Sequence, residues 1–344
     1  MRERLAERIW FGADVPARLA RAALAPLGWI YGGASGLRNM LYDSGALPAR
    51  ELALPAVSIG NLTVGGTGKT PVAAEVARRL AARGARPAIV LRGYGGDEPL
   101  VHERLNPGIV VVATPDRVAG AREARRRGAD AVVLDDAFQH RRAARLADIV
   151  LLSADRWGSG RRHALPAGPW RESLRALRRA SLVVVTRKAA DDAVVRTLVE
   201  TCHRVADVPV AVARLAPGGL ASAGDDTHRP VAALHDARVL AIAAIGDPAA
   251  FLRQLGALGA RVTPRIFGDH HHFARAEVTT LAREAAAHDL VVCTLKDAVK
   301  LAPLWPRAAP CLWYVSQAVS FEAGEPDLDR LLGRLIDARP PTLT

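Results

Sequence analysis

Short apolar runs alternate with amphipathic segments along most of the chain, beginning near residue 56. The runs are continuous and do not alternate with polar positions, which is typical of strands buried on both faces of a parallel sheet. Segments of helical periodicity separate them, and this order predicts an α/β fold with a doubly wound, mostly parallel sheet. The strands expected in this first set are residues 56–60, 87–91, 108–113, 131–136, 148–153 and 181–186.

The helices between these strands can be placed by their periodicity and their ends. Residues 70–83 put Val72 and Val76 on one stripe and stop before Gly84, a residue type that is common just past a helix end. A second helix is expected over 115–127. Strand and helix therefore alternate as they do in a doubly wound domain.

The pattern lapses over residues 211–237, which are rich in turn-forming residues and predict a linker or a hairpin. A second α/β set follows, which predicts a smaller lobe and a cleft between two lobes. Its expected strands are 238–245, 261–267, 289–295 and 311–316, and its expected helices are 248–258, 274–287 and 326–337. The predicted division is an N-terminal segment (1–50), a first α/β domain (51–212), a linker or hairpin (213–237) and the second lobe (238–344).

The N-terminal segment is unusually apolar. Residues 22–37 carry no charge, but a spanning helix needs about 20 apolar residues, and this stretch is shorter and interrupted by Pro26 and glycines. It also lacks the cleavage site of a signal peptide. Arginines mixed with large apolar side chains such as Trp29 and Ile30 suit a helix that lies in a membrane interface. The alternative is a helix packed on the protein's own core, and the sequence leaves both open.

Charge and cysteine content change this picture little. The formal net charge is +12, from 47 Lys and Arg against 35 Asp and Glu, which favours an anionic partner such as nucleic acid, a membrane surface or a phosphorylated substrate. The abundance of Arg and Ala is also what a GC-rich genome produces, so charge alone does not select among these. The 3 cysteines are far apart and form no C-x-x-C pair, which fits a reducing cytosol.

A glycine-rich loop follows the first expected strand. The sequence TVGGTGKT leads into the helix over 70–83, and inward-turned N–H groups beside a helix N-terminus form a phosphate site. Lys69 is expected to reach the β- and γ-phosphates of a nucleotide, and the Thr70 hydroxyl is expected to hold Mg²⁺. Thr63 stands where the strict P-loop pattern has glycine. The expected nucleotide-binding residues are Thr63, Val64, Gly65, Gly66, Thr67, Gly68, Lys69 and Thr70.

A P-loop needs a further carboxylate near the metal, carried at the end of another buried strand. The segment AVVLDDAFQH supplies Asp135 and Asp136 where the strand over 131–136 meets a loop. One of the two is expected to contact Mg²⁺, directly or through water.

Three other clusters stand at the ends of expected elements. RGYGGDEP, over 92–99, follows a strand, at the position where active-site groups of open α/β sheets lie. GDHHHF, over 268–273, presents adjacent histidines that point apart on a strand end, so acid–base chemistry is favoured over a metal site. In LPAGPWRE, over 165–172, Arg171 either stabilises a transferring phosphate or forms a surface ion pair.

Taken together, these motifs resemble the tetraacyldisaccharide 4′-kinase family, the lipid A kinases of Gram-negative bacteria. They occur in the family's order and span most of the chain, and Thr63 is itself what the family has at that position. The matching segments are GNLTVGGTGKTP at 60–71, RGYG with GDEP at 92–99, TPDRVAGA at 114–121, LDDAFQH at 134–140, LPAGPWRE at 165–172, AIGDP at 244–248, DHHHF at 269–273 and TLKDAVKL at 294–301.

The resemblance implies a reaction and assigns roles. The γ-phosphate of Mg²⁺-bound ATP would pass to the 4′ hydroxyl of an acylated glucosamine disaccharide 1-phosphate, giving lipid IV-A. Asp97 resembles the base that receives the hydroxyl proton, with His270 as its partner, and Asp136 contributes to catalysis from the metal shell. The remaining implied positions are Lys69, Thr70, Asp135 and Asp136 for phosphate and metal, His140, Arg171 and Glu172 on the nucleotide side, and Tyr94 and Arg92 near the sugar.

The resemblance also implies a setting. An interfacial N-terminus would place the enzyme on the cytoplasmic face of the inner membrane, where the acyl chains of its lipid substrate stay in the bilayer. We expect a monomer with no nucleic-acid partner. The chain departs from the family by fusing RGYG directly to GDEP, which removes a couple of dozen residues, and by carrying Leu295 in TLKDAVKL where glutamate is usual.

Three other function classes compete with this hypothesis. A P-loop GTPase or metallochaperone would need N-K-x-D after a strand, and VVVTRKAAD at 183–191 has Ala190 where the aspartate should fall. A nucleic-acid-dependent ATPase would explain the charge, but aromatic residues are only 5% of the chain and no basic stripe is interleaved with them. A nucleotide-binding module without catalysis would not need Asp97 and His270.

Overall fold

The structure is a computed structural model that describes residues 2–93, 96–158, 162–246, 248–269 and 271–340. Its contacts divide the chain into two compact units. Unit 1 contains residues 96–104 and 216–318, and unit 2 contains residues 2–93, 105–215 and 319–340 among those described. The predicted boundaries at 212 and 237 do not coincide with the limits of these units.

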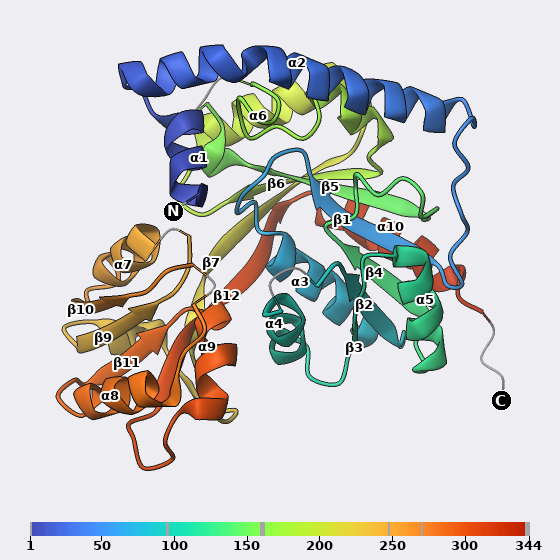
Figure 1. Ribbon diagram of the computed structural model, residues 1–344. Helices are drawn as coiled ribbons and strands as arrows, with labels where there is room; N and C mark the ends of the chain where they lie inside the picture. The colour runs from blue at the N-terminus through green and yellow to red at the C-terminus, as the bar shows by residue number, and fades with distance from the viewer. Residues whose placement is uncertain (1, 94–95, 159–161, 247, 270, 341–344) are drawn as a thin grey trace. The chain divides into compact units, whose positions relative to one another are not determined.

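Unit 2 is built on a parallel sheet in the order β7-β6-β5-β1-β4-β2-β3 (Figure 1). The strands predicted by the first set of apolar runs are confirmed, because each run pairs with parallel neighbours, and all but the edge strand β3 are largely buried. Their bounds are β1 (Ala56–Asn61), β2 (Pro87–Leu91), β3 (Val110–Ala113), β4 (Ala131–Asp135), β5 (Ala147–Ser153), β6 (Leu182–Arg187) and β7 (Val210–Ser222), of which β7 enters unit 1 after Leu215.

Helices cover both faces of this sheet. Successive strand residues point to opposite faces, and Val57 and Ile59 of β1 lie in one cluster with α3 (Lys69–Ala82) and α10 (Glu325–Asp337). On the other face, Val132 and Leu134 of β4 pack with α5 (Arg117–Arg126). The same face is continued at β5 and β6 by α6 (Asp192–Val205) and the short helix η2 (Leu174–Arg179). The doubly wound arrangement is therefore confirmed.

The N-terminus forms two helices of unit 2, α1 (Arg2–Phe11) and α2 (Val15–Asp43). The helix expected in the N-terminal segment is confirmed, and α2 continues through Pro26 to Asp43. One side of α2 contacts the protein at Ala17 and Gly28, both buried, and a side chain at Gly28 would meet the Ala164 carbonyl at 3.2 Å. Within the described part of the chain, no helix combines the length and apolar character that a membrane crossing requires.

Unit 1 is a smaller α/β unit whose strands follow the order β10-β9-β11-β12-β7. The predicted strands of the second set and its helices over 248–258 and 274–287 are confirmed. The helix expected over 326–337 forms as α10 but belongs to unit 2. The linker predicted from 211 was wrong in its first part, because β7 runs through the turn-forming residues to Ser222. The hairpin alternative holds for the remainder, since β8 pairs antiparallel with β7. The bounds are β8 (His228–Arg229), β9 (Arg238–Ala243), β10 (Arg261–Ile266), β11 (Leu290–Cys293), β12 (Leu312–Ala323), α7 (Pro248–Ala257), α8 (Arg275–Ala285) and α9 (Leu295–Leu301).

A short helix encoded between β2 and β3 also belongs to unit 1. This helix, α4 (Glu98–Leu105), is tied there by Arg104, which donates to the carbonyls of Ser222 and Asp225 (2.6 Å for the latter) and lies over the Tyr314 ring at 5.9 Å. Asp97 immediately precedes α4. The sequence places Asp97 in the first α/β domain, whereas its contacts place it in unit 1.

Candidate active site

The glycine-rich loop lies between the end of β1 and the start of α3. Gly65 and Gly68 have φ angles of +113° and +85°, which L side chains rarely adopt, so glycine is required at both positions. Gly68 is the N-cap of α3, and Lys69 and Thr70 begin the helix. Backbone N–H groups and the positive end of a helix therefore meet at this loop, as phosphate binding requires.

Two buried side chains fix the loop at Thr67, whose residue exposure is 2%. The Asn61 amide donates to the Thr67 hydroxyl at 2.8 Å, and the Thr186 hydroxyl donates to the Thr67 carbonyl at 2.9 Å. Gln139 in turn donates to the Asn61 carbonyl at 2.9 Å. The loop is thus held by β1, β6 and the segment after β4 before any ligand binds.

The two predicted carboxylates lie beside the loop. Asp135 ends β4 and is in register with Ile59 of the neighbouring β1, which places it close to the loop's entry. Asp136 has a φ of +50° and its carboxylate lies 3.5 Å from the Lys69 ammonium. Parallel neighbouring strands thus bring the pair to the edge of the sheet where the phosphate loop begins.

Arg171 joins this group from the segment LPAGPWRE. One of its terminal nitrogens donates to both Asp136 carboxylate oxygens, at 2.8 and 3.0 Å. Burial raises the pKa of Asp136, but the charges of Lys69 and Arg171 outweigh it and hold the pKa below its ordinary value. Asp136 is therefore ionised at neutral pH and linked to two cations.

The segment carrying Arg171 pairs with the entry of the phosphate loop. The Val64 N–H donates to the Pro169 carbonyl at 2.8 Å, and the Arg171 N–H donates to the Leu62 carbonyl at 2.7 Å. Sequence spacing alone does not indicate this pairing, since the two segments are about a hundred residues apart. These backbone hydrogen bonds place Arg171, which the sequence predicted to act on phosphate, beside the phosphate loop.

Glu172 points to a different part of unit 2. Its carboxylate accepts hydrogen bonds from the Asn39 amide of α2 at 2.6 Å and from Arg179 at 2.9 Å, and its side chain is 4% exposed. These contacts join α2 to the segment LPAGPWRE and to η2. The implied role of Glu172 on the nucleotide side stays a prediction, whereas its contacts indicate a structural role.

Replacing Glu172 with alanine is expected to lower the free energy of unfolding by roughly 3 kcal/mol, because it leaves the largely buried Arg179 without its carboxylate. Urea unfolding measures this change. Glu172→Gln is the matched control, since it keeps an acceptor for Asn39 and should lose less. An alanine variant of normal stability with a raised KM for ATP would instead favour the nucleotide role.

His140 follows the carboxylate pair and is half-buried. Its backbone N–H donates to the Ala137 carbonyl at 2.9 Å. Burial lowers the pKa of His140, and the charges of Arg117 and Arg145 lower it further. The imidazole is therefore neutral at pH 7, a form that can accept or donate one hydrogen bond. Its implied place on the nucleotide side remains a prediction.

The oxygen donors at the loop fit a magnesium ion. Mg²⁺ prefers carboxylate, hydroxyl, phosphate and water oxygens. The Thr70 hydroxyl at the start of α3, with Asp135 and Asp136 after β4, supplies such donors at neighbouring ends of β1 and β4. No nitrogen or sulfur ligand is involved, so the donor set suits this cation.

The remaining predicted residues lie apart from the loop in the sequence. Arg92 is exposed and directly follows β2. Asp97 is 4% exposed and its carbonyl accepts from the Val101 N–H at 3.0 Å at the start of α4. Tyr94 and His270 lie outside the described residues. His271, the residue after His270, stacks on Phe267 with ring centres 4.9 Å apart, and its Nε2 lies 3.3 Å from the Glu277 carboxylate in unit 1.

The structure adds residues that motif spacing did not identify. Asn61 and Thr186 fix the loop, and the Arg156 guanidinium lies against Gly65, where a Cβ atom would come within 2.6 Å of Arg156 Nη1. Thr186 is a polar residue that ends the apolar run of β6. A polar residue in that position is the one sequence signal that could have indicated a residue fixing the phosphate loop.

A strand, a glycine-rich loop, a helix beginning with Lys69 and Thr70, and a carboxylate pair on the adjacent strand define a P-loop nucleotide-binding protein of the α/β class. Within that class, the chain belongs to the family described as tetraacyldisaccharide-1-P 4′-kinase, whose model matches residues 20–96 and 95–337.

Individual relatives agree with this assignment. The chain is 43% identical over 346 aligned residues to the tetraacyldisaccharide 4′-kinase of Anaeromyxobacter dehalogenans strain 2CP-C, covering 88% of each protein. It is 38% identical over 321 residues to that of Geobacter sulfurreducens, covering 86% of this chain and 88% of the relative. The crystal structure of LpxK from Aquifex aeolicus in complex with ATP is similar with a TM-score of 0.74 and 29% identity, over 92% of this chain and 99% of that one.

Proposed function

We propose that this protein is an ATP-dependent kinase that phosphorylates the 4′ hydroxyl of tetraacyldisaccharide 1-phosphate to give lipid IV-A. The observation that carries the proposal is the geometry of the phosphate loop. There the Lys69 ammonium lies 3.5 Å from an Asp136 carboxylate oxygen, and Arg171 donates to the same carboxylate. The names of the relatives and the ATP complex of the Aquifex protein support the choice of substrates.

The transfer is a displacement at phosphorus. The oxygen of the sugar hydroxyl forms a bond to the γ-phosphorus, the bond from that phosphorus to the β–γ bridging oxygen breaks, and its electrons leave on ADP. Asp97 would take the hydroxyl proton, with His270 as its partner. Lys69 and the loop N–H groups would hold the phosphates in line and stabilise their charge.

Thr70, Asp135 and Asp136 would hold the magnesium ion, which when bound neutralises charge on the phosphate oxygens. Arg171 fixes the orientation of Asp136 through its paired hydrogen bonds, and Thr67 is fixed by Asn61 and Thr186. The chain's own residues thus preorganise the phosphate site, which is how phosphoryl-transfer enzymes gain most of their rate.

The decisive experiment incubates the purified protein with γ-labelled ATP, Mg²⁺ and tetraacyldisaccharide 1-phosphate in detergent. Transfer of label to the lipid is expected. ATP hydrolysis that nucleic acid stimulates, with no labelled lipid, would instead favour the ATPase alternative.

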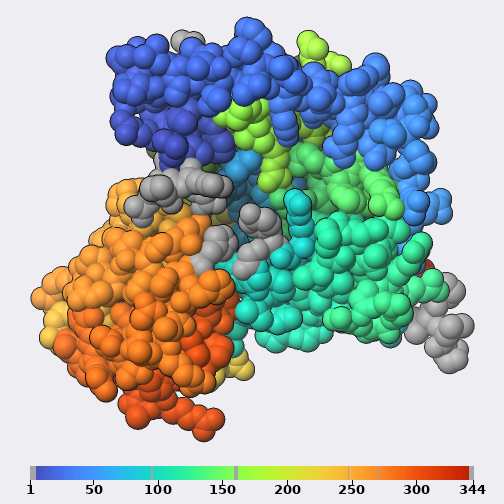
Figure 2. Space-filling view, in the orientation of Figure 1, coloured from blue at the N-terminus to red at the C-terminus, as the bar shows by residue number. Residues whose placement is uncertain are grey.

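We further propose that α1 and α2 bind the cytoplasmic surface of the inner membrane. The outer side of α2, which Figure 2 shows uncovered at the top of the view, carries large apolar side chains. Arg18 and Arg21 precede the uncharged stretch of this helix, and Arg38 follows it. The exposed apolar residues of α2 are Val15, Leu19, Leu27, Trp29, Ile30, Tyr31, Leu37 and Met40. Such a surface suits the boundary between headgroups and acyl chains, where a lipid substrate presents its sugar.

The double variant Trp29→Ser, Ile30→Ser tests this membrane surface. The two side chains are 75% and 68% exposed, so their removal should leave the melting temperature unchanged while reducing binding to anionic vesicles at least tenfold. Each large apolar side chain that enters the interface contributes about 1.5–3 kcal/mol. Vesicle co-sedimentation measures the binding, and Ala34→Ser on the same helix is the control. Equal sedimentation of variant and parent would show that this face does not contact lipid.

A further inference from the structure

Arg156 lies directly over the phosphate loop, although no motif led to it. It ends the short helix η1 (Ala154–Arg156), which follows β5, the parallel neighbour of β1. A Cβ atom built on Gly65 would lie 2.6 Å from Arg156 Nη1 and 3.2 Å from its Cζ. The guanidinium therefore packs on the bare backbone of Gly65, in the part of the loop where only glycine fits.

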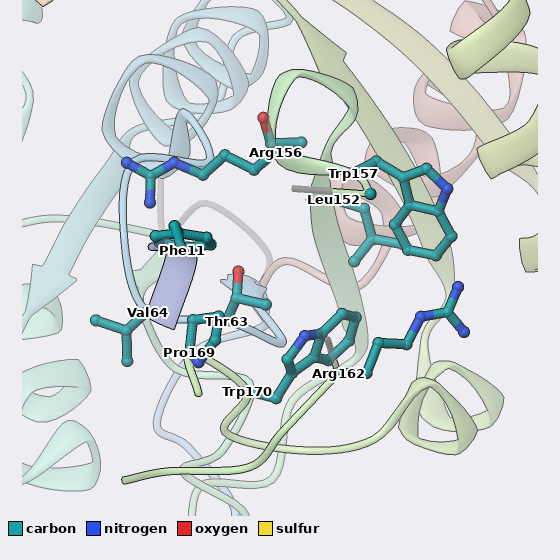
Figure 3. A pocket seen from close by; sticks show the side chains of 11 residues that line it. Phe11, Thr63, Val64, Leu152, Arg156, Trp157, Arg162, Pro169 and Trp170 are labelled. Atoms are coloured by element: carbon teal, nitrogen blue, oxygen red, sulfur yellow. The ribbon is translucent and has the colours of Figure 1, made fainter. Parts of the chain in front are cut away.

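The side of the loop that Arg156 approaches is also defined. A cavity of about 240 Å³ opens there, lined on the loop side by Thr63 and Val64, and Arg156 is among its other lining residues (Figure 3). Thr63 and Val64 begin the loop, at the end farthest from the first turn of α3. Because the helix N-terminus and its glycines hold the α- and β-phosphates, a group that approaches from the other end meets the terminal phosphate.

Arg156 also contacts α1, through an ion pair and a ring contact that a phosphate could replace. One terminal nitrogen lies 3.5 Å from the Glu7 carboxylate, and the guanidinium lies 5.6 Å from the centre of the Phe11 ring (Figure 3). The side chains of Arg156 and Glu7 are 34% and 42% exposed, and exposed ion pairs of this kind contribute little to stability. A phosphate oxygen carrying full charge would compete with Glu7 for this guanidinium.

Arg171, the other arginine at the phosphate loop, cannot exchange its carboxylate partner for a phosphate as easily. Arg171 already donates twice to Asp136, which also pairs with Lys69. Moving Arg171 onto a phosphate would leave the partly buried Asp136 carboxylate with one cation fewer. Arg156 contacts Glu7 and Phe11 of α1, and its planar, always charged guanidinium matches phosphate oxygens.

We infer that Arg156 is a further catalytic residue, which leaves Glu7 and Phe11 to bind the terminal phosphoryl group of the nucleoside triphosphate as it is transferred. It acts as an arginine finger supplied by the chain itself, stabilising the charge that spreads over the phosphoryl oxygens. The inference rests on the proposed kinase function for its reaction, but its geometry involves only the nucleotide.

The test compares Arg156→Ala with Arg162→Ala. Arg162 lines the same cavity but lies over the Trp157 ring at 4.4 Å, so it controls for lost charge and packing. Arg156→Ala should lower kcat for lipid phosphorylation at least a hundredfold, weaken binding of a non-hydrolysable ATP analogue at least tenfold, and leave ADP binding within twofold. Arg162→Ala should keep all three within threefold of the parent, and Arg156→Lys should recover part of the lost rate.

Glu7→Gln supplies a second, independent measurement, because it frees Arg156 without removing it. Its kcat should equal or exceed that of the parent. Equal losses of ATP-analogue and ADP affinity in Arg156→Ala, or a parental kcat, would overturn the inference while label transfer by the parent still supports the kinase. If the parent transfers no label to the lipid, the proposed function fails, and the ratio of analogue to ADP affinity still decides the role of Arg156.

Discussion

Replacing Lys69 with alanine is expected to lower kcat for lipid phosphorylation by about a thousandfold, the loss that follows removal of a preorganised group from developing transition-state charge. The Lys69 side chain is 17% exposed and its ammonium lies 3.5 Å from Asp136, so it is already placed at the phosphate loop before ATP binds. A rate measured with saturating γ-labelled ATP and lipid isolates the transfer step from nucleotide binding.

The fold should survive this change, which keeps the measurement interpretable. Asp136 retains both hydrogen bonds from Arg171 when the ammonium is lost, so its charge stays compensated. The melting temperature should therefore shift little. Lys69→Arg is the matched comparison: it keeps the charge but replaces a compact ammonium with a planar fork, and it should recover only part of the rate. An alanine variant with parental kcat would mean that this loop does not bind the transferring phosphate.

The elements that sequence could predict are those whose cause is local. The runs that became β1, β4 and β6 are apolar throughout because helices cover both faces of the sheet, and their bounds match the expected strands closely. The phosphate loop could also be predicted from the sequence, because its glycines are required by backbone angles within the loop itself. Gly65 and Gly68 both have positive φ angles.

The errors arose where distant partners override local preference. Residues 217–219 of β7 are Pro-Gly-Gly, which predict a turn, but β7 continues past them because neighbouring strands satisfy its backbone, with Ser316 donating to the Gly219 carbonyl at 3.1 Å. The helix expected over 326–337 was assigned to the second lobe, whereas α10 packs in unit 2, where Glu325 pairs with Arg79 at 2.6 Å.

The same distinction holds within the site. Asp135 and Asp136 could be predicted because a carboxylate at the end of a buried strand is a local pattern. The pairing of Arg171 with Asp136, the engagement of Glu172 by Asn39 and the position of Arg156 on Gly65 could not, because each depends on how separate loops of unit 2 fold against one another. The sequence motif therefore located the phosphate loop, but it did not predict which partner each charged side chain near the loop contacts.

Asp97→Asn is expected to lower kcat for lipid phosphorylation at least a hundredfold, as loss of a general base does. The amide has almost the shape of the carboxylate but cannot take the hydroxyl proton. Asp97 is 4% exposed at the start of α4, and Glu103→Gln, exposed on the same helix, removes one negative charge as the control.

Nucleotide affinity distinguishes a lost base from a damaged site. A proton acceptor for the sugar hydroxyl is not needed to hold the nucleotide, so the variant should bind ATP and ADP as the parent does, with the loss confined to kcat. At a fixed pH, activity that returns with added small-molecule bases would identify the missing function as proton acceptance. Unchanged turnover would show that Asp97 takes no part in the mechanism. The kinase proposal would still be supported by Lys69 and its carboxylate partners, because phosphoryl transfer depends more on holding and neutralising the phosphate than on proton removal.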